Sequence, residues 1–93
     1  MAAYVIVHAT IKNPEKMAEY AAVAGPSIAS FGGQLLARGA SEVLFGGHPH
    51  GVMVVIEFAD RAQAKAWYNS PVYQAAIPAR GEGMDSVFIL GGE

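Results

Sequence analysis

The order of strand-like and helix-like segments constrains the fold of this chain more than any other feature of its sequence. Four stretches have the apolar pattern that is typical of strands: residues 3–11, 33–38 with 42–45, 52–59 and 84–90. Two helical regions lie between them, at residues 14–31 and 60–80. The order β-α-β-β-α-β predicts a single α+β domain over residues 1–93. Right-handed crossovers then give a ferredoxin-like, four-stranded antiparallel sheet with its helices on one face.

Capping residues mark where the helices begin. Asn13 is suited to cap the first helix, with Pro14 in its first turn. Asp60 and Gln63 have the spacing of a capping box at the start of the second helical region. Pro26 lies inside the first helical region and removes one backbone hydrogen bond, so we expect a kink there or two helices in series.

The sheet face opposite the helices has too many apolar residues to remain in water. Apolar residues make up 53% of the 93 residues and charged residues only 15%, which is rich in apolar groups for a small monomer. The strand alternation places these residues on the open face: Tyr4, Ile6, His8, Leu36, Arg38, Met53, Val55, Glu57, Phe88 and Leu90. No further helix is available to cover them, so we expect a second copy to pack against this face as a two-fold homodimer.

Composition excludes several classes of function. The chain has no cysteine, which excludes disulfides and thiolate metal sites. The net charge is −2 and the six basic residues are scattered, so a nucleic-acid partner is not expected. No secretory signal is visible and the longest strongly apolar run, residues 52–56, is too short to span a bilayer, so we expect a cytoplasmic protein. No motif for haem, flavin or nicotinamide is present, and no cofactor is expected.

The segment from Glu57-Phe58 through Ser70-Pro71-Val72-Tyr73 to Arg80 resembles the family named domain of unknown function 1330, within the dimeric α/β-barrel superfamily. Further matches are Phe31-Gly32-Gly33, Leu36-Ala37-Arg38-Gly39, Glu42-Val43-Leu44 and Gly91, so the likeness covers nearly the whole chain. The resemblance implies a dimer with a pocket between the sheet and the helix corner. It implies no reaction, because the family has none established. The chain departs from the family pattern at residues 48–51, before the third strand.

Three polar residues of the predicted open face are candidates for chemistry. His8 is the candidate base whose ordinary pKa lies near neutrality. Glu57, between apolar neighbours, is a second candidate acid or base. Arg38 has the fork geometry to hold a carboxylate or enolate oxygen. The alternative is structural: Arg38 and Glu57 pair with each other at the dimer interface, and His8 is a hydrogen-bonded interior residue.

The helix corner supplies a second set of candidate binding residues. Ser70 is expected to cap the helix that Pro71 opens, which occupies its hydroxyl. Tyr73 and Arg80 lie seven residues apart and would share a face if one helix runs through Pro78. Tyr73 would then orient a ligand, and Arg80 would bind an anion or cap the helix end. Trp67, Tyr68 and Tyr20 are expected to pack the helices on the sheet or to form a pocket wall.

A metal site is not expected. His48 and His50 lie in a glycine-rich connection, but no cysteine or nearby carboxylate completes a ligand set. We expect a solvated hairpin tip instead.

Two functional hypotheses remain open from the sequence. In the first, the protein is a small-molecule-binding protein, or a cofactor-independent enzyme that acts on small anionic or carbonyl metabolites. Proton transfer would then involve His8 or Glu57, while Arg38 and Arg80 hold the anion. In the second, the protein is a non-catalytic dimeric binding or interaction module, and its polar residues serve only the packing.

Overall fold

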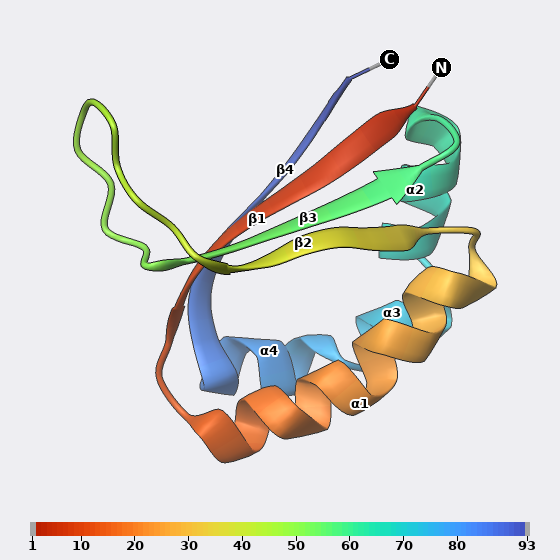
Figure 1. Ribbon diagram of the computed structural model, residues 1–93. Coiled ribbons are helices and arrows are strands. Elements are labelled where there is room, and N and C mark those ends of the chain that lie inside the picture. Colours follow the sequence, from red (N-terminus) through yellow and green to blue (C-terminus); the bar gives the residue numbers. More distant parts are fainter. Residues whose placement is uncertain (1, 93) are drawn as a thin grey trace.

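The computed structural model describes residues 2–92, and its central feature is one antiparallel sheet with the strand order β2-β3-β1-β4. The strands are β1 (Ala3–Ile11), β2 (Gln34–Ala40), β3 (Val52–Phe58) and β4 (Met84–Gly92). The helices are α1 (Pro14–Ser30), α2 (Arg61–Tyr68), α3 (Pro71–Gln74) and α4 (Ile77–Gly83). All helices lie on one face of the sheet, as Figure 1 shows. The predicted ferredoxin-like α+β fold is confirmed.

Helix α1 is continuous from Pro14 to Ser30, although Pro26 lies inside it, so the chain does not form two helices in series. The Asn13 side chain accepts hydrogen bonds from the backbone N–H groups of Glu15 and Lys16, as an N-cap does. Gly25 directly precedes Pro26. Because glycine has no Cβ, the clash that usually disfavours a helical residue before proline is reduced.

The second helical region divides into three short helices, of which α2 and α3 begin at side-chain caps and α4 begins with Pro78 in its first turn. Asp60 accepts a hydrogen bond from the N–H of Gln63 and caps α2. The Gln63 side chain does not complete a capping box; its amide donates to the carbonyl oxygen of Phe31 at 2.8 Å and ties α2 to the end of α1. Ser70 caps α3, as predicted.

The core lies between the sheet and the helices. Its largest fully buried side chains are Trp67, Tyr73 and Phe58. The indole N–H of Trp67 donates to the hydroxyl of Ser27 at 3.0 Å, and Ser27 donates to the carbonyl oxygen of Ala24. The one polar atom of this large side chain is therefore satisfied inside the core.

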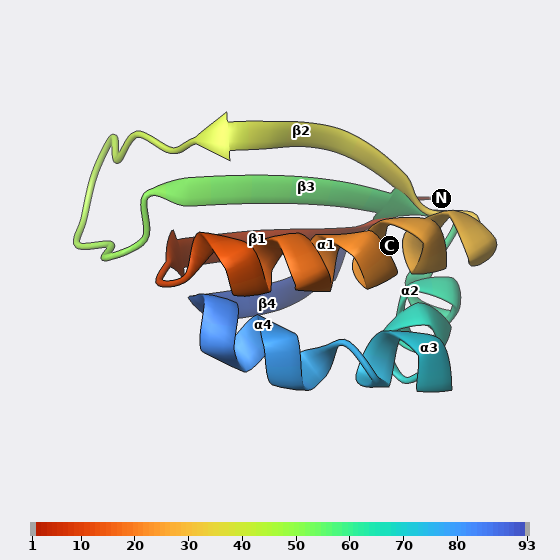
Figure 2. The same ribbon diagram turned by 90° about the horizontal axis from the view of Figure 1, so that it is seen from below.

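The helices cover the half of the sheet formed by β1 and β4. Figure 2 shows α1 in front of β1, with β2 and β3 standing clear of the helices. All seven residues of β2 are exposed, which agrees with this arrangement. The helix side of β2 and β3 is therefore available to form the wall of a cleft.

Strand β2 differs from the sequence-based prediction in two respects. It ends at Ala40, and residues 42–45 form no strand because β3 begins only at Val52 and offers them no partner. The pairing also shifts between Leu35 and Ala37, since Leu35 is opposite Ile56 whereas Ala37 is opposite Val55. Leu36 is the extra residue of a β-bulge, which moves every later side chain of β2 to the other face.

The sequence-based prediction assigned two residues of β4, Phe88 and Leu90, to the wrong face of the sheet. Phe88 and Leu90 pair with Val7 and Val5, whose side chains are buried on the helix side. Both pack against the core and not on the open face. The open face instead carries Val87 and Ile89, which are exposed.

Candidate functional site

The helix corner is the turn between α2 and α3, and the hydroxyl of Ser70 holds it in place. This buried hydroxyl donates to the carbonyl oxygen of Trp67 at 2.7 Å and accepts from the N–H of Tyr73 at 3.2 Å. Both interactions belong to the turn between α2 and α3, so the hydroxyl serves capping, as predicted. The turn places the Tyr73 ring against Trp67, with ring centroids 4.3 Å apart.

A network of tyrosine hydroxyls and one arginine connects the four helices α1, α2, α3 and α4 beneath the sheet. The Tyr20 and Tyr73 hydroxyls share a hydrogen bond of 2.8 Å. One nitrogen of Arg80, Nη1, donates to the hydroxyls of Tyr73 at 3.1 Å and Tyr68 at 3.0 Å. The Arg80 guanidinium also lies 4.8 Å from the centroid of the Phe88 ring. Arginine is thus surrounded by aromatic faces, a favourable environment for its cation.

Burial and hydrogen bonding determine the protonation of this network. Burial raises the pKa of the Tyr20 hydroxyl, and the neighbouring Tyr73 raises it further. Burial also raises the pKa of Tyr73, although its bonds to Tyr20 and Arg80 act in the opposite direction. Burial alone would lower the pKa of Arg80, but the hydrogen bonds to Tyr68 and Tyr73 outweigh it and leave that pKa raised. The network therefore holds two neutral buried phenols beside a persistent cation.

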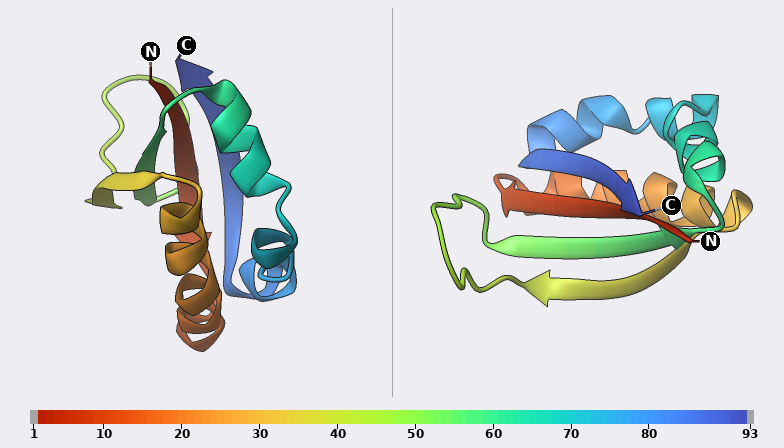
Figure 3. Two further views of the ribbon diagram at one scale, coloured as in Figure 1. Left: turned by 90° about the vertical axis from the view of Figure 1, so that its right-hand side faces the viewer. Right: turned by 90° about the horizontal axis from the view of Figure 1, so that it is seen from above.

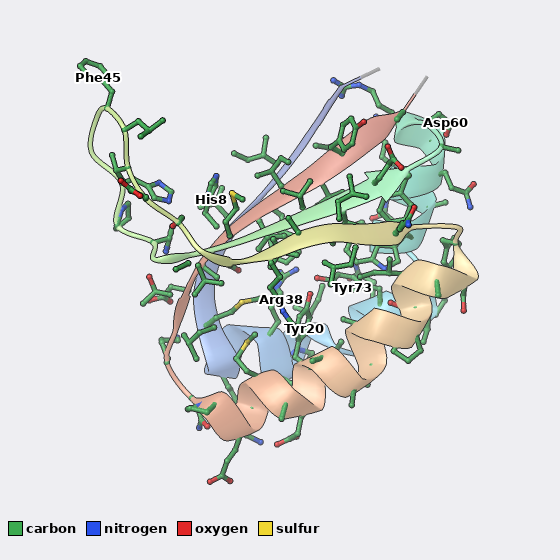
Figure 4. The ribbon with its side chains drawn as sticks, viewed as in Figure 1. His8, Tyr20, Arg38, Phe45, Asp60 and Tyr73 are labelled. Atoms are coloured by element: carbon green, nitrogen blue, oxygen red, sulfur yellow. The ribbon has the colours of Figure 1, made fainter. Side chains whose placement is uncertain are left out.

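A cleft of about 510 Å³ lies between α1 and the helix side of the sheet. Its walls are mostly apolar and include Val7, Val54 and Ile56 of the strands and Ala21, Ala24 and Ile28 of α1. Tyr20 and Phe88 also line it, so the cleft touches the tyrosine–arginine network. Figure 4 shows Tyr20 and Arg38 together in this space below the sheet. The volume lies in the range of about 300–1,000 Å³ that small-molecule sites occupy.

Arg38 lines this cleft and not the open face, which corrects the sequence-based placement. The bulge at Leu36 is the physical reason: Arg38 pairs with Val54, whose side chain is on the helix side. The guanidinium of Arg38 forms no ion pair and no side-chain hydrogen bond with any other residue in the range 2–92. Arg38 is therefore an exposed cation at the edge of an apolar cleft, and its expected pairing with Glu57 does not occur.

His8 and Glu57 remain on the open face but do not form one site within a single chain. Glu57 is opposite Tyr4 in the sheet and accepts a hydrogen bond from its hydroxyl at 3.0 Å, and this bond raises the pKa of Tyr4. His8 lies four residues further along β1, about 13 Å away at the strand rise. Its Nδ1 atom is buried and has no hydrogen-bond partner among the residues that the structure describes, 2–92.

The structure therefore brings together only part of the predicted set. Tyr73 and Arg80 meet in one network, and Ser70 supports it through the turn. Arg38 joins the same side of the sheet, whereas His8 and Glu57 lie on the other. Sequence reasoning assigned Tyr20 to packing or a pocket wall and missed its hydrogen bond to Tyr73. A tyrosine on the apolar stripe of a helix is a usable signal, because its buried hydroxyl needs a partner.

The described residues contain no group of three or more histidine or carboxylate side chains arranged to hold a metal ion. The rings of His48 and His50 lie 5.6 Å apart, and His48 contacts the ring of His8 edge-on at 4.5 Å. The connection that was expected to be a solvated hairpin tip therefore contacts the sheet through His48, whose ring lies against His8.

Among residues 2–92, no helix has the length and apolar character needed to cross a bilayer.

The sheet order and the helices on one face define this protein as a ferredoxin-like α+β protein. The chain belongs to the family described as domain of unknown function (DUF1330), whose sequence pattern matches residues 2–92. The predicted resemblance is confirmed. No curated protein is detectably similar to the chain in sequence.

Solved structures share the fold at low sequence identity. A protein of unknown function from Rhodopseudomonas palustris has a TM-score of 0.79 and 20% identity, covering 99% of this chain and 82% of its own. A dimeric ferredoxin-like protein of unknown function from Thermobifida fusca has a TM-score of 0.65 and 18% identity, covering 100% and 92%. SnoaB, a cofactor-independent oxygenase from Streptomyces nogalater, has a TM-score of 0.69 and 13% identity, covering 99% and 92%.

Proposed function

We propose that this protein binds a small organic anion, with a largely apolar body, in the cleft between α1 and the sheet. The observation that carries the proposal is the chemistry of that cleft. Its walls are apolar, Arg38 stands at its edge, and Tyr20 connects it to the buried Arg80 network. An apolar ligand body gains from leaving water, and the arginine selects a carboxylate or an enolate oxygen.

Arg38 and Arg80 have different roles in this proposal. Arg38 is exposed, so its guanidinium is free to turn and form charge-assisted hydrogen bonds to the ligand. Arg80 is half-buried and committed to two tyrosine hydroxyls through Nη1. It holds Tyr73, and through Tyr73 the hydroxyl of Tyr20, in a fixed position facing a ligand oxygen. Ser70 acts only through the turn that carries Tyr73.

The test compares pairs of ligands that differ only in charge, such as benzoate with benzamide and hexanoate with hexanamide. Calorimetric titration of wild type should show tighter binding of each carboxylate than of its amide. Arg38→Ala should weaken carboxylate binding by roughly 10- to 100-fold, because hydrogen bonds to charged groups contribute about 1.5–3 kcal/mol. Amide binding should change little.

The control variant is Arg61→Ala. Arg61 is exposed, lies outside the cleft and donates a hydrogen bond to the carbonyl oxygen of Gly92. The affinity of this variant for the carboxylates should equal that of wild type. Equal losses in both arginine variants would show a general charge effect and would contradict an Arg38 site. So would unchanged binding in Arg38→Ala.

Proton transfer on the open face is a second candidate function. It is supported by the unpartnered Nδ1 of His8 and by the fold shared with a cofactor-independent oxygenase. If His8 or Glu57 moves a proton, the protein should exchange the α-hydrogens of small keto acids with deuterium from D₂O, as followed by proton NMR. His8→Ala and Glu57→Gln are the variants that should lower this exchange. If the α-hydrogens exchange no faster with wild type than without protein, the proton-transfer function is contradicted and ligand binding alone remains.

A further inference from the structure

The connection between β2 and β3, residues 41–51, projects from the sheet and has a closed base; we call it the arm. Ser41 closes the base by two bonds: its N–H donates to the carbonyl oxygen of Gly51 at 3.0 Å, and its hydroxyl donates to that of His50 at 3.1 Å. These contacts bring the two ends of the arm together. The arm therefore leaves the sheet in a defined direction.

The returning half of the arm is pinned to the open face through β1. The hydroxyl of Thr10 lies 2.9 Å from Nδ1 of His50, and it donates to the carbonyl oxygen of Pro49 at 3.4 Å. The His48 ring meets the His8 ring edge-on, with 4.5 Å between the centroids. Both contacts use side chains of β1 that point away from the helices. They hold the arm on the open-face side of the sheet.

The tip of the arm carries two large apolar side chains in full contact with solvent. Leu44 is 93% exposed and Phe45 is 97% exposed. Figures 1 and 3 show the arm rising beyond the end of the sheet, on the side opposite the helices. Figure 4 shows Phe45 at its outermost point, directed away from the rest of the chain. A leucine and a phenylalanine exposed together at a loop tip are typical of an interaction site.

The surface beside the arm is also apolar. On the open face, Val87 and Ile89 of β4 are exposed, and Ile6 and Val55 are half-buried between them and β2. The open face and the arm thus form two adjoining walls that a single partner can contact at once. The Thermobifida fusca relative, which shares the fold, is described as dimeric.

We propose that the arm is a clasp that closes on a second copy of this chain seated on the open face, with Leu44 and Phe45 buried against that copy. Two-fold symmetry then gives two identical clasps, one from each copy. The proposal rests on the expected pairing of two open faces and adds the arm as the element that closes over the second copy. It does not depend on the cleft, which lies on the opposite face of the sheet.

Charge argues against a membrane as the occupant. The arm contains one acidic residue, Glu42, and no lysine or arginine. Segments that dock on anionic lipid surfaces use clusters of basic residues around their apolar anchors. A second copy needs no such cluster, because its matching open face is apolar.

The test is the dimer dissociation constant of the full chain, measured by sedimentation across a dilution series. The variant carries Leu44→Ser and Phe45→Ser together. Its dissociation constant should rise by at least about 10-fold, since two large apolar side chains lose their burial in each clasp. The matched control is Val72→Ser, which removes an exposed apolar side chain from α3 on the helix side. This control should dimerise like wild type.

Hydrogen exchange supplies a second readout. Among residues 2–92, no backbone hydrogen bond protects the amides of residues 42–47. In wild type they should exchange more slowly at concentrations above the dissociation constant than below it. A dissociation constant within twofold of wild type in the arm variant would overturn the proposal. So would equally fast exchange at both concentrations, or arm-dependent binding to phosphatidylcholine vesicles with an unchanged dimer.

Discussion

The hydroxyl oxygens of Tyr20 and Tyr73 lie 2.8 Å apart, although 53 residues separate them in the sequence. One comes from the middle of α1 and the other from the four-residue helix α3. Their bond continues through Arg80 to Tyr68, so a single polar chain links the cleft to the helix corner. It positions the polar end of an otherwise apolar site.

Removal of these hydroxyls should show that they act as a unit. Tyr20→Phe should lower the free energy of unfolding by about 1 kcal/mol, the typical value for a buried hydrogen bond. Tyr73→Phe should cost more, because its hydroxyl has two partners. In the double variant the losses should not add, since the second removal breaks a bond that is already lost. Urea unfolding measures all four proteins, and additive losses would contradict the coupling.

The same hydroxyls predict lower stability in alkali. The pKa values of Tyr20 and Tyr73 are raised in the folded protein, whereas tyrosines of the unfolded chain ionise near a pH of about 10. Stability is therefore unaffected below about pH 10 and falls as the pH rises from there toward the folded-state values. The urea midpoint should decrease across this range, and less steeply in Tyr20→Phe. Equal slopes in the two proteins would contradict the assignment.

The fold was predictable because it depends on patterns that a sequence displays directly. The order of apolar strands and the caps at Asn13, Asp60 and Ser70 are local signals, and the structure uses all of them. The face on which Arg38 lies was not predictable. It depends on the bulge at Leu36, and the one glycine of the strand, Gly39, lies three residues beyond that position.

The candidate site was predictable only in part, for the same reason. Tyr73 and Arg80 were expected to meet on one helix that runs through Pro78, but they meet from two helices, α3 and α4. Tyr20 joins them through tertiary packing, which sequence spacing does not encode. His8 and Glu57 share a face, as predicted, but the register sets them four residues apart.

Filling the cleft should separate ligand binding from stability. Ala21 lines the cleft on α1, and replacement by leucine adds apolar volume where the ligand body is proposed to lie. Ala21→Leu should abolish carboxylate binding with little loss of thermal stability, because both residues favour helices. Ala22→Leu, one position along the same helix and outside the cleft lining, is the matched control. Calorimetric titration should give wild-type affinity for this control.

Ser70 should prove to be structural. Ser70→Ala removes the cap of α3 and the bond to Trp67, and should lower the free energy of unfolding by about 0.5–2 kcal/mol. At temperatures well below the melting point, carboxylate affinity should fall far less than in Arg38→Ala. Ser30→Ala, at an exposed position near the end of α1, should change neither quantity much. A loss of affinity in Ser70→Ala equal to that in Arg38→Ala would assign Ser70 a direct contact instead.

The most direct measurement of the proposed cleft is a titration of ¹⁵N-labelled protein with benzoate or hexanoate, followed by proton–nitrogen correlation NMR. The largest shifts should fall on the backbone amides of Ala21, Ala24 and Val54 and on Nε of Arg38. Shifts concentrated at Tyr4, His8 and Val87 would instead place the ligand on the open face. That result, or an unperturbed Arg38 at saturation, would contradict the account.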